Sequence, residues 1–188
     1  MGAIHAAATR TTRRTLIITT RRTSACYASS SGAKPRILES KYAKEVLRGW
    51  EAVQCACTLT RRVQQGIADG ELESKEDASP VTVADYGAQA IINWYLSQTD
   101  PSGKPLEMVA EEDSGTLRRP ENAAMLSRIV DVVNDALQAH PKTRSIMGRP
   151  NGCNGLDATS VMANIDLGNS DGGRQGLCWV LDPIGTRI

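Results

Sequence analysis

The sequence predicts a layered α/β protein in which helices alternate with short strands and the functional site lies at the strand ends. Three observations lead to this prediction. Apolar residues recur at helical spacing in several segments of the 188-residue chain. Two short apolar runs, at residues 106–110 and 177–181, are typical of buried strands. Acidic residues follow both runs, so carboxylates gather at one edge of the sheet if the two strands are neighbours.

Two helices are predicted in the first half of the chain. The first spans residues 39–67, where apolar side chains at three- and four-residue steps form one face: Val46, Trp50, Val53 and Cys57. The second runs from about Thr82 to Ser97, after a polar, loop-like stretch at residues 66–76. Its expected buried stripe consists of Ala84, Ala88, Ile91, Ile92, Tyr95 and Leu96.

The second half continues with a turn at residues 101–105 and the strand at Leu106–Ala110. Pro120 opens a third helix that ends near His140, and its apolar face is Leu126, Ile129, Val130, Val133 and Leu137. Residues 142–155 are rich in Gly and Pro and predict a surface loop.

A fourth helix is expected at Asp157–Leu167, followed by a loop at residues 169–176. The closing strand, Leu177–Leu181, has little polar alternation, which predicts burial on both faces.

Charge divides the chain into a basic leader and an acidic body. Residues 1–36 hold seven Arg and Lys, eleven Ser and Thr, and neither Asp nor Glu. This composition is typical of an organelle transit peptide, so we expect residues 1–36 to lie outside the fold and to direct the protein to a chloroplast or mitochondrion. A disordered basic tail or a misassigned start on a cytoplasmic protein is the alternative. Residues 37–188 then form the domain.

The composition also excludes several classes of function. The body after residue 36 carries 15 basic and 21 acidic residues, a net charge of −6, which argues against a broad nucleic-acid surface. The apolar run at residues 16–18 is too short to span a membrane. Five cysteines are odd in number and match no zinc spacing, so reduced thiols are the simplest interpretation and a redox-sensing pair at Cys55 and Cys57 the alternative.

Carboxylates from three segments define the candidate site. Glu111 and Asp182 each follow an apolar strand, while Asp85 lies on the second helix and shares a face with Thr82. The turn after Asp182 adds backbone carbonyls and the Thr186 hydroxyl. An all-oxygen site of this kind selects magnesium or manganese and suits phosphate hydrolysis. Taken singly, each residue is more often part of a solvated helix start, an exposed helix position or an ordinary turn, and only their combination indicates a site.

Three motifs in chain order resemble the signatures of the 3'(2'),5'-bisphosphate nucleotidases, in the inositol monophosphatase superfamily. The first is Lys75–Ala90, which contains SPVTVADY, and the second is Val109–Ser114 (VAEEDS). The third comprises Ile165–Gly168, the Gly172-Gly173 loop and Trp179–Ile184 (WVLDPI). The likeness spans roughly residues 37–188 and implies a sugar-phosphatase-like fold of alternating helix and sheet layers.

The resemblance assigns a role to each candidate residue. It implies that Glu111, Asp182 and the main-chain carbonyl of Ile184 bind metal. It implies that Asp85 deprotonates the nucleophilic water with Thr186 as its partner, Thr186 also being a candidate substrate contact. Two or more Mg²⁺ ions are implied, with Mn²⁺ possible and Li⁺ inhibitory. The implied substrate is adenosine 3',5'-bisphosphate, hydrolysed to AMP and phosphate, or the related sulfate donor that carries a 3'-phosphate.

The chain departs from the family pattern in its last residues. The family turn reads Asp-Pro-Ile-Asp-Gly-Thr, whereas Gly185 directly follows Ile184 here, and the family continues through a second α/β half. We therefore expect an N-terminal, truncated part of the fold, with impaired phosphatase activity and an unpaired edge on its last strand. An inositol monophosphate phosphatase and a non-catalytic paralogue are the alternatives, and the oligomeric state is undetermined.

Overall fold

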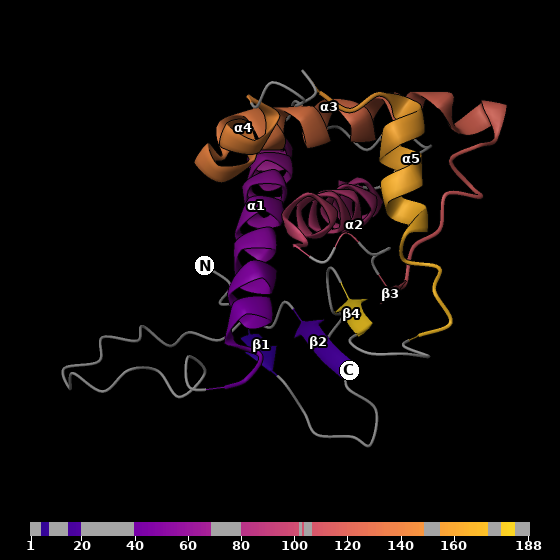
Figure 1. Ribbon diagram of the computed structural model, residues 1–188. Helices are drawn as coiled ribbons and strands as arrows, with labels where there is room; N and C mark the ends of the chain where they lie inside the picture. Colours follow the sequence, from indigo (N-terminus) through magenta and orange to yellow (C-terminus); the bar gives the residue numbers. More distant parts are fainter. Residues whose placement is uncertain are drawn as a thin grey trace.

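The computed structural model describes residues 5–7, 15–19, 40–68, 80–101, 103, 107–148, 155–172 and 178–182. Within these ranges the α-helices gather on one side of a small sheet, and α2 lies surrounded by α1, α3 and α5 (Figure 1). This arrangement confirms the predicted α/β class. In the part of the chain that is described, no helix is long and apolar enough to cross a membrane.

Helices α1 (Ala43–Ala68) and α2 (Pro80–Thr99) form the centre of the core. The predicted stripe of α2 is buried throughout: Ala84, Ala88, Ile91, Ile92, Tyr95 and Leu96. The two helices cross closely at Gly87, where an added Cβ would lie 2.6 Å from a Leu59 methyl group. Because helices pack on α2 from several sides, nearly every side chain from Val83 to Leu96 is buried, and Asp85 is the half-buried exception.

One predicted core residue of α1 is wrong. Trp50 is 46% exposed, although Val46 and Val53 are buried as expected and Cys57 is half-buried. The buried face continues instead through Ala56, Leu59 and Val63. Since successive helical residues are rotated by about 100°, this stripe places Trp50 to one side of the contact with α2. Leu47, one turn earlier, is also exposed.

The third predicted helix is present, but a further helix follows it. The 3-10 helix η2 (Pro120–Asn122) leads into α3 (Ala123–Ala139), and α4 (Pro141–Met147) occupies part of the predicted loop at residues 142–155. Proline suits the first position of a helix, and the Thr143 hydroxyl donates to the His140 carbonyl at 2.9 Å. Thr143 and Ile146 are buried, so tertiary packing supports a segment that resembles a loop in composition.

Helix α5 (Ala158–Asp166) matches the fourth predicted helix. Asp157 caps its N-terminus, because the carboxylate accepts a hydrogen bond from the Ser160 N–H at 2.7 Å. Val161 and Ile165 turn toward the core. The helix ends beside strand β3, and this position matters for the site.

The sheet has the strand order β1-β2-β4-β3, formed by β1 (His5–Ala7), β2 (Thr15–Thr19), β3 (Met108–Ala110) and β4 (Cys178–Asp182). Strand β2 is antiparallel to β1 and parallel to β4, and β3 is parallel to β4. Two expectations are corrected here. Parts of the leader form strands, and β4 has β2 and β3 on its two sides rather than an unpaired edge. The targeting function of residues 1–36 stays a prediction.

Both predicted strands of the body are present. Met108, Trp179 and Leu181 join the core formed by the helices, whereas Val180 and Asp182 are only half-buried. On the other face Cys178 is buried as well, so β4 is fully covered on one face and partly covered on the second, and the predicted burial on both faces is confirmed in part. The outer edge of β3 is also occupied, since the Gly168 carbonyl accepts the Ala110 N–H and the Ser170 N–H donates to the Met108 carbonyl.

Candidate functional site

The parallel pairing of β3 and β4 brings two candidate carboxylates to one edge of the sheet. Ala110 pairs with Leu181, so Glu111 and Asp182 occupy the next position along the two strands. Side chains at paired positions of parallel strands point to the same face. Glu111 is exposed and Asp182 is half-buried, and both lie at the carboxyl end of their strands, as the sequence predicts.

Asp85 approaches this edge from the first half of helix α2. Its carboxyl is half-buried, and burial, followed by the charges of Glu112, Glu111 and Asp182, raises the pKa of Asp85 to about 6. Burial is the largest cause, and the contributions of the three charges place Glu112, Glu111 and Asp182 in the neighbourhood of Asp85. The predicted site residues Asp85, Glu111 and Asp182 thus lie in one neighbourhood, to which the structure adds Glu112. We call these four residues the Asp85 cluster.

The two adjacent glutamates of the cluster have different surroundings. Glu111 is exposed, whereas Glu112 is half-buried and receives a hydrogen bond from the Tyr86 hydroxyl. Burial raises the pKa of Glu112, the Tyr86 hydroxyl opposes that rise, and the charges of Glu111 and Asp113 add to it. Tyr86 is itself buried next to Asp85 on α2. Glu112 is thus tied to the helix, and Glu111 is the glutamate that is free to meet a ligand.

Gln89 holds the backbone of Glu112 against the same helix. Its Oε1 accepts the Glu112 N–H at 3.1 Å, and its Nε2 donates to the Glu112 carbonyl at 2.6 Å and to the Ile165 carbonyl at 2.9 Å. The side chain is fully buried. Gln89 is not among the site residues predicted from the sequence, although an amide inside an otherwise apolar stripe, one turn after Asp85, is a usable signal.

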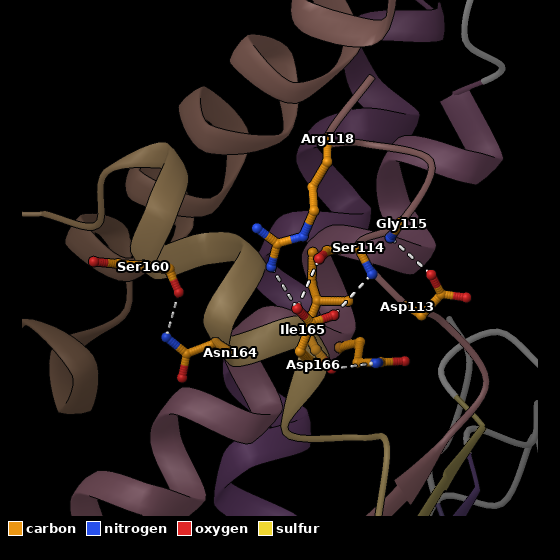
Figure 2. A network of polar contacts seen from close by, with 9 residues as sticks. Asp113, Ser114, Gly115, Arg118, Ser160, Asn164, Ile165 and Asp166 are labelled. Atoms are coloured by element: carbon orange, nitrogen blue, oxygen red, sulfur yellow. Dashed lines mark hydrogen bonds and ion pairs between the residues drawn. The ribbon is translucent and has the colours of Figure 1, made fainter. Parts of the chain in front are cut away.

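A second polar group fixes the acidic loop, residues 111–118, from the side of α5, as Figure 2 shows. The Asp166 carboxylate accepts hydrogen bonds from the Ser114 N–H at 2.8 Å and the Ser114 hydroxyl at 2.7 Å, and pairs with Arg118 at 2.7 Å. Burial opposes ionisation, but these hydrogen bonds and the Arg118 charge outweigh it and lower the pKa of Asp166. We call Asp166, Ser114 and Arg118 the Asp166 clamp. These contacts are not predicted by any pattern in the sequence.

Gly168 allows α5 to end directly against the site. An added Cβ would lie 2.7 Å from the Ala110 Cβ and 2.8 Å from Gln89 Nε2. Neither atom can easily move, because one is fixed to the strand and the other makes two hydrogen bonds. Gly168 belongs to the third sequence motif, and the close approach supplies a physical reason for a glycine there.

The Asp85 cluster has the donor chemistry of a magnesium site but does not form a complete ligand cage. Carboxylate oxygens are hard ligands, and Mg²⁺ takes one or two of them while keeping several waters. Within the described ranges, no group of three or more His, Cys, Asp or Glu side chains is arranged to hold a metal ion. Ile184 and Thr186, the remaining predicted site residues, lie outside the described residues.

A separate polar network between α1, α2 and α4 does not resemble a catalytic site. Cys55 Sγ lies 3.3 Å from His140 Nδ1, and Glu51 accepts from the Tyr95 hydroxyl at 2.7 Å and pairs with Lys142. Cys55 is buried, and burial raises the pKa of its thiol to about 12. A thiol with this pKa carries almost no thiolate at neutral pH. Among the described cysteines, Cys55, Cys57 and Cys178 form no disulfide.

Comparisons with known proteins point in one direction. No protein-family model matches the chain. A 3'(2'),5'-bisphosphate nucleotidase 1 of Arabidopsis thaliana is 40% identical over 147 residues, which cover 78% of this chain and 39% of that protein. A 3'(2'),5'-bisphosphate nucleotidase of Oryza sativa is 39% identical over 78% of this chain and 38% of its own length. A 3',5'-bisphosphate nucleotidase 2 of Arabidopsis thaliana is 39% identical, over 78% and 40%. The chain thus spans about two fifths of these relatives.

Proposed function

Because the chain belongs to the family of 3'(2'),5'-bisphosphate nucleotidases, we propose that its Asp85 cluster is the site of a magnesium-dependent phosphatase. The proposed substrate is adenosine 3',5'-bisphosphate, whose 3'-phosphate is hydrolysed to leave AMP and phosphate. The related sulfate donor with a 3'-phosphate is a second proposed substrate, in keeping with a role in sulfur metabolism. These assignments draw on the names of relatives that are longer than this chain.

The observation that carries the proposal is the position of Asp85. Its carboxyl is half-buried on α2, and burial together with the charges of Glu112, Glu111 and Asp182 raises its pKa to about 6. At neutral pH such a group is mostly ionised and is still a stronger base than an ordinary aspartate. This favours Asp85 as the residue that accepts a proton from the attacking water, with Thr186 as its proposed partner.

The residues proposed to hold metal are Glu111, Asp182 and the carbonyl of Ile184. When Mg²⁺ is bound, it lowers the pKa of a coordinated water and neutralises charge on the phosphate. A cation there would also offset the charges of Glu112, Glu111 and Asp182, which disfavour the ionised form of Asp85. Two ions are proposed for a complete site, with Mn²⁺ as a substitute and Li⁺ as an inhibitor.

We propose that the turn after Asp182 limits activity in this chain. Gly185 follows Ile184 directly, whereas the family pattern places an aspartate between them. The absence of that carboxylate removes a proposed metal ligand and shifts Thr186 by one position. Loss of even an outer-shell partner commonly costs about 10–100-fold in metal affinity or activity, so loss of a ligand is expected to cost more.

Phosphate release tests the proposal. The full chain and a variant with Asp inserted between Ile184 and Gly185 are each given adenosine 3',5'-bisphosphate or inositol 1-phosphate, with and without Mg²⁺. We expect slow, magnesium-dependent release from the nucleotide, faster release after the insertion, and none in either background when Asp85→Asn is added. Faster release from inositol 1-phosphate contradicts the proposed substrate. Release that is unchanged by Asp85→Asn contradicts the proposed base.

A further inference from the structure

The amide of Gln89 joins three segments that meet at the Asp85 cluster. It belongs to α2, it binds both backbone groups of Glu112 in the acidic loop, and it binds the Ile165 carbonyl near the end of α5. The pairing with Glu112 is reciprocal, since Oε1 accepts the N–H and Nε2 donates to the carbonyl. Two antiparallel hydrogen bonds to one residue fix its position and its rotation together.

We call the Gln89 amide and the Glu112 peptide that it binds the Gln89 clamp, which is distinct from the Asp166 clamp and joins two parts of the Asp85 cluster. Gln89 follows Asp85 by one helical turn, so both side chains lie on the same face of α2. Glu112 is bonded covalently to Glu111, the glutamate whose side chain is exposed. Fixing the Glu112 peptide therefore fixes the direction in which Glu111 leaves the strand, relative to the helix that carries Asp85. Gln89 itself is 0% exposed and is not available to a ligand.

We propose that Gln89 is a positioning residue, which sets the Glu111 carboxylate relative to Asp85 by clamping the Glu112 peptide to helix α2. The proposal rests on the proposed function, since it names what orients that site. The site gains pre-organisation: the acidic residues are held near one another before any ligand arrives, which lowers the cost of binding.

A purely structural role for Gln89 needs a control, and α2 contains one. Asn93 lies one turn further along, is also 0% exposed, and donates from Nδ2 to the Asn164 carbonyl of α5 at 2.8 Å. Both residues are buried amides that tie α2 to α5, but the hydrogen bonds to the acidic loop belong to Gln89. Replacing Asn93 therefore reproduces the loss of a buried amide without touching the clamp.

The test compares Gln89→Met with Asn93→Leu in the full chain, first without metal. Hydrogen exchange at the Glu112 amide is the direct readout, because that N–H donates to Gln89 Oε1. We expect its protection to fall at least tenfold in Gln89→Met and to remain in Asn93→Leu. Equal protection in both variants overturns the proposal. If Gln89→Met does not fold, Gln89→Asn keeps a buried amide that is one methylene too short to reach Glu112.

A titration with Mn²⁺ alone supplies the second readout. We expect Gln89→Met to weaken Mn²⁺ binding about tenfold or more, in the range found for residues that orient metal ligands, and Asn93→Leu to leave it unchanged. Equal weakening in both variants shows a merely structural role and overturns the proposal. If the unsubstituted chain does not bind Mn²⁺, the metal-dependent function fails, and the exchange data alone decide whether the clamp exists.

Discussion

The two ends of the acidic loop, residues 111–118, place carboxylates in opposite circumstances. Near one end, at Glu111 and Glu112, lies the half-buried Asp85 of α2. Burial and the charges of Glu112, Glu111 and Asp182 raise the pKa of Asp85 to about 6. At the other end, Asp166 is surrounded by donors from Ser114 and Arg118, which outweigh burial and lower its pKa. The same short loop thus connects the Asp85 cluster, where like charges lie close together, to the Asp166 clamp, where every charge has a partner of opposite sign or a hydrogen-bond donor. The Asp166 clamp anchors the loop that carries Glu111 and Glu112.

The largest effect on stability should come from breaking the Asp166 clamp. Asp166→Ala leaves the buried Ser114 hydroxyl, its N–H and Arg118 without their acceptor, and we expect it to lower the free energy of unfolding by about 3 kcal/mol. Urea denaturation of the full chain measures this. The control is Asp113→Ala, because exposed Asp113 accepts from the Gly115 N–H within the loop. Equal losses of stability in Asp166→Ala and Asp113→Ala would contradict the prediction that Asp166 stabilises the loop more than Asp113 does.

Gly168→Ala should strain the junction between the two regions. The added methyl group would lie 2.7 Å from the Ala110 Cβ, on the strand that leads to Glu111. Overpacking against a fixed neighbour costs about 2 kcal/mol, so we expect that loss of stability by urea denaturation. Gly103→Ala is a control for spatial crowding, since an added Cβ there meets nothing within 4 Å, although its φ of 63° itself disfavours alanine. If Gly168→Ala leaves the free energy of unfolding unchanged, α5 can move away from β3 to make room for the methyl group.

Removing a charge from the Asp85 cluster should raise the free energy of unfolding, whereas the two substitutions above lower it. In the unfolded chain Asp85 titrates near 3.8, and in the folded chain near 6, so the folded state binds the proton more tightly. Stability from this group is therefore fully present below pH 3.8 and is lost as pH rises to about 6. After discounting for solvent screening, we expect Asp85→Asn to stabilise the metal-free chain by about 1 kcal/mol at pH 7.5.

Thermal unfolding across pH checks this prediction. The stabilisation by Asp85→Asn should shrink as pH falls from 6 towards 3.8. Asp166→Asn should behave in the reverse way, since the lowered pKa of Asp166 makes its contribution present above the unfolded value of 3.8 and lost below it. If Asp85→Asn destabilises the metal-free chain at neutral pH, the four carboxylates do not repel as described.

The smallest effect concerns the metal. At an Mg²⁺ concentration equal to its dissociation constant, binding to the folded state alone stabilises the chain by about 0.4 kcal/mol. We expect a corresponding rise in melting temperature, which Glu111→Gln removes and Asp113→Asn retains. A rise that persists in Glu111→Gln places the ion elsewhere.

The sequence predicted the helices and the two body strands well, because their apolar periodicity is strong and their burial follows from it. Trp50 was misplaced, since a helix with apolar residues on more than one side does not reveal which side meets the core. Helix α4 was missed because Thr143 and Ile146 stabilise it through tertiary contacts.

The site was predicted in part. Glu111 and Asp182 follow apolar strands, so their convergence could be inferred, and the motif around Asp85 completed the set. Gln89 and Asp166 could not be assigned, because their roles depend on backbone groups 23 and 52 residues away in the sequence. Hydrogen bonds between a side chain and a distant backbone leave no periodic pattern.

The position of β4 between β2 and β3 has a consequence for the order of folding. Strand β2 pairs Thr15–Thr19 with Cys178–Asp182, which are synthesised last among the described residues, whereas α1, α2 and α3 contact one another through nearer parts of the chain. Pairings between segments so distant in sequence form slowly. The helices can therefore collapse first during synthesis, while the edge of β2 that pairs with β4 stays open. The Asp85 cluster, which needs Asp182, can be assembled only after all of the described residues have been synthesised.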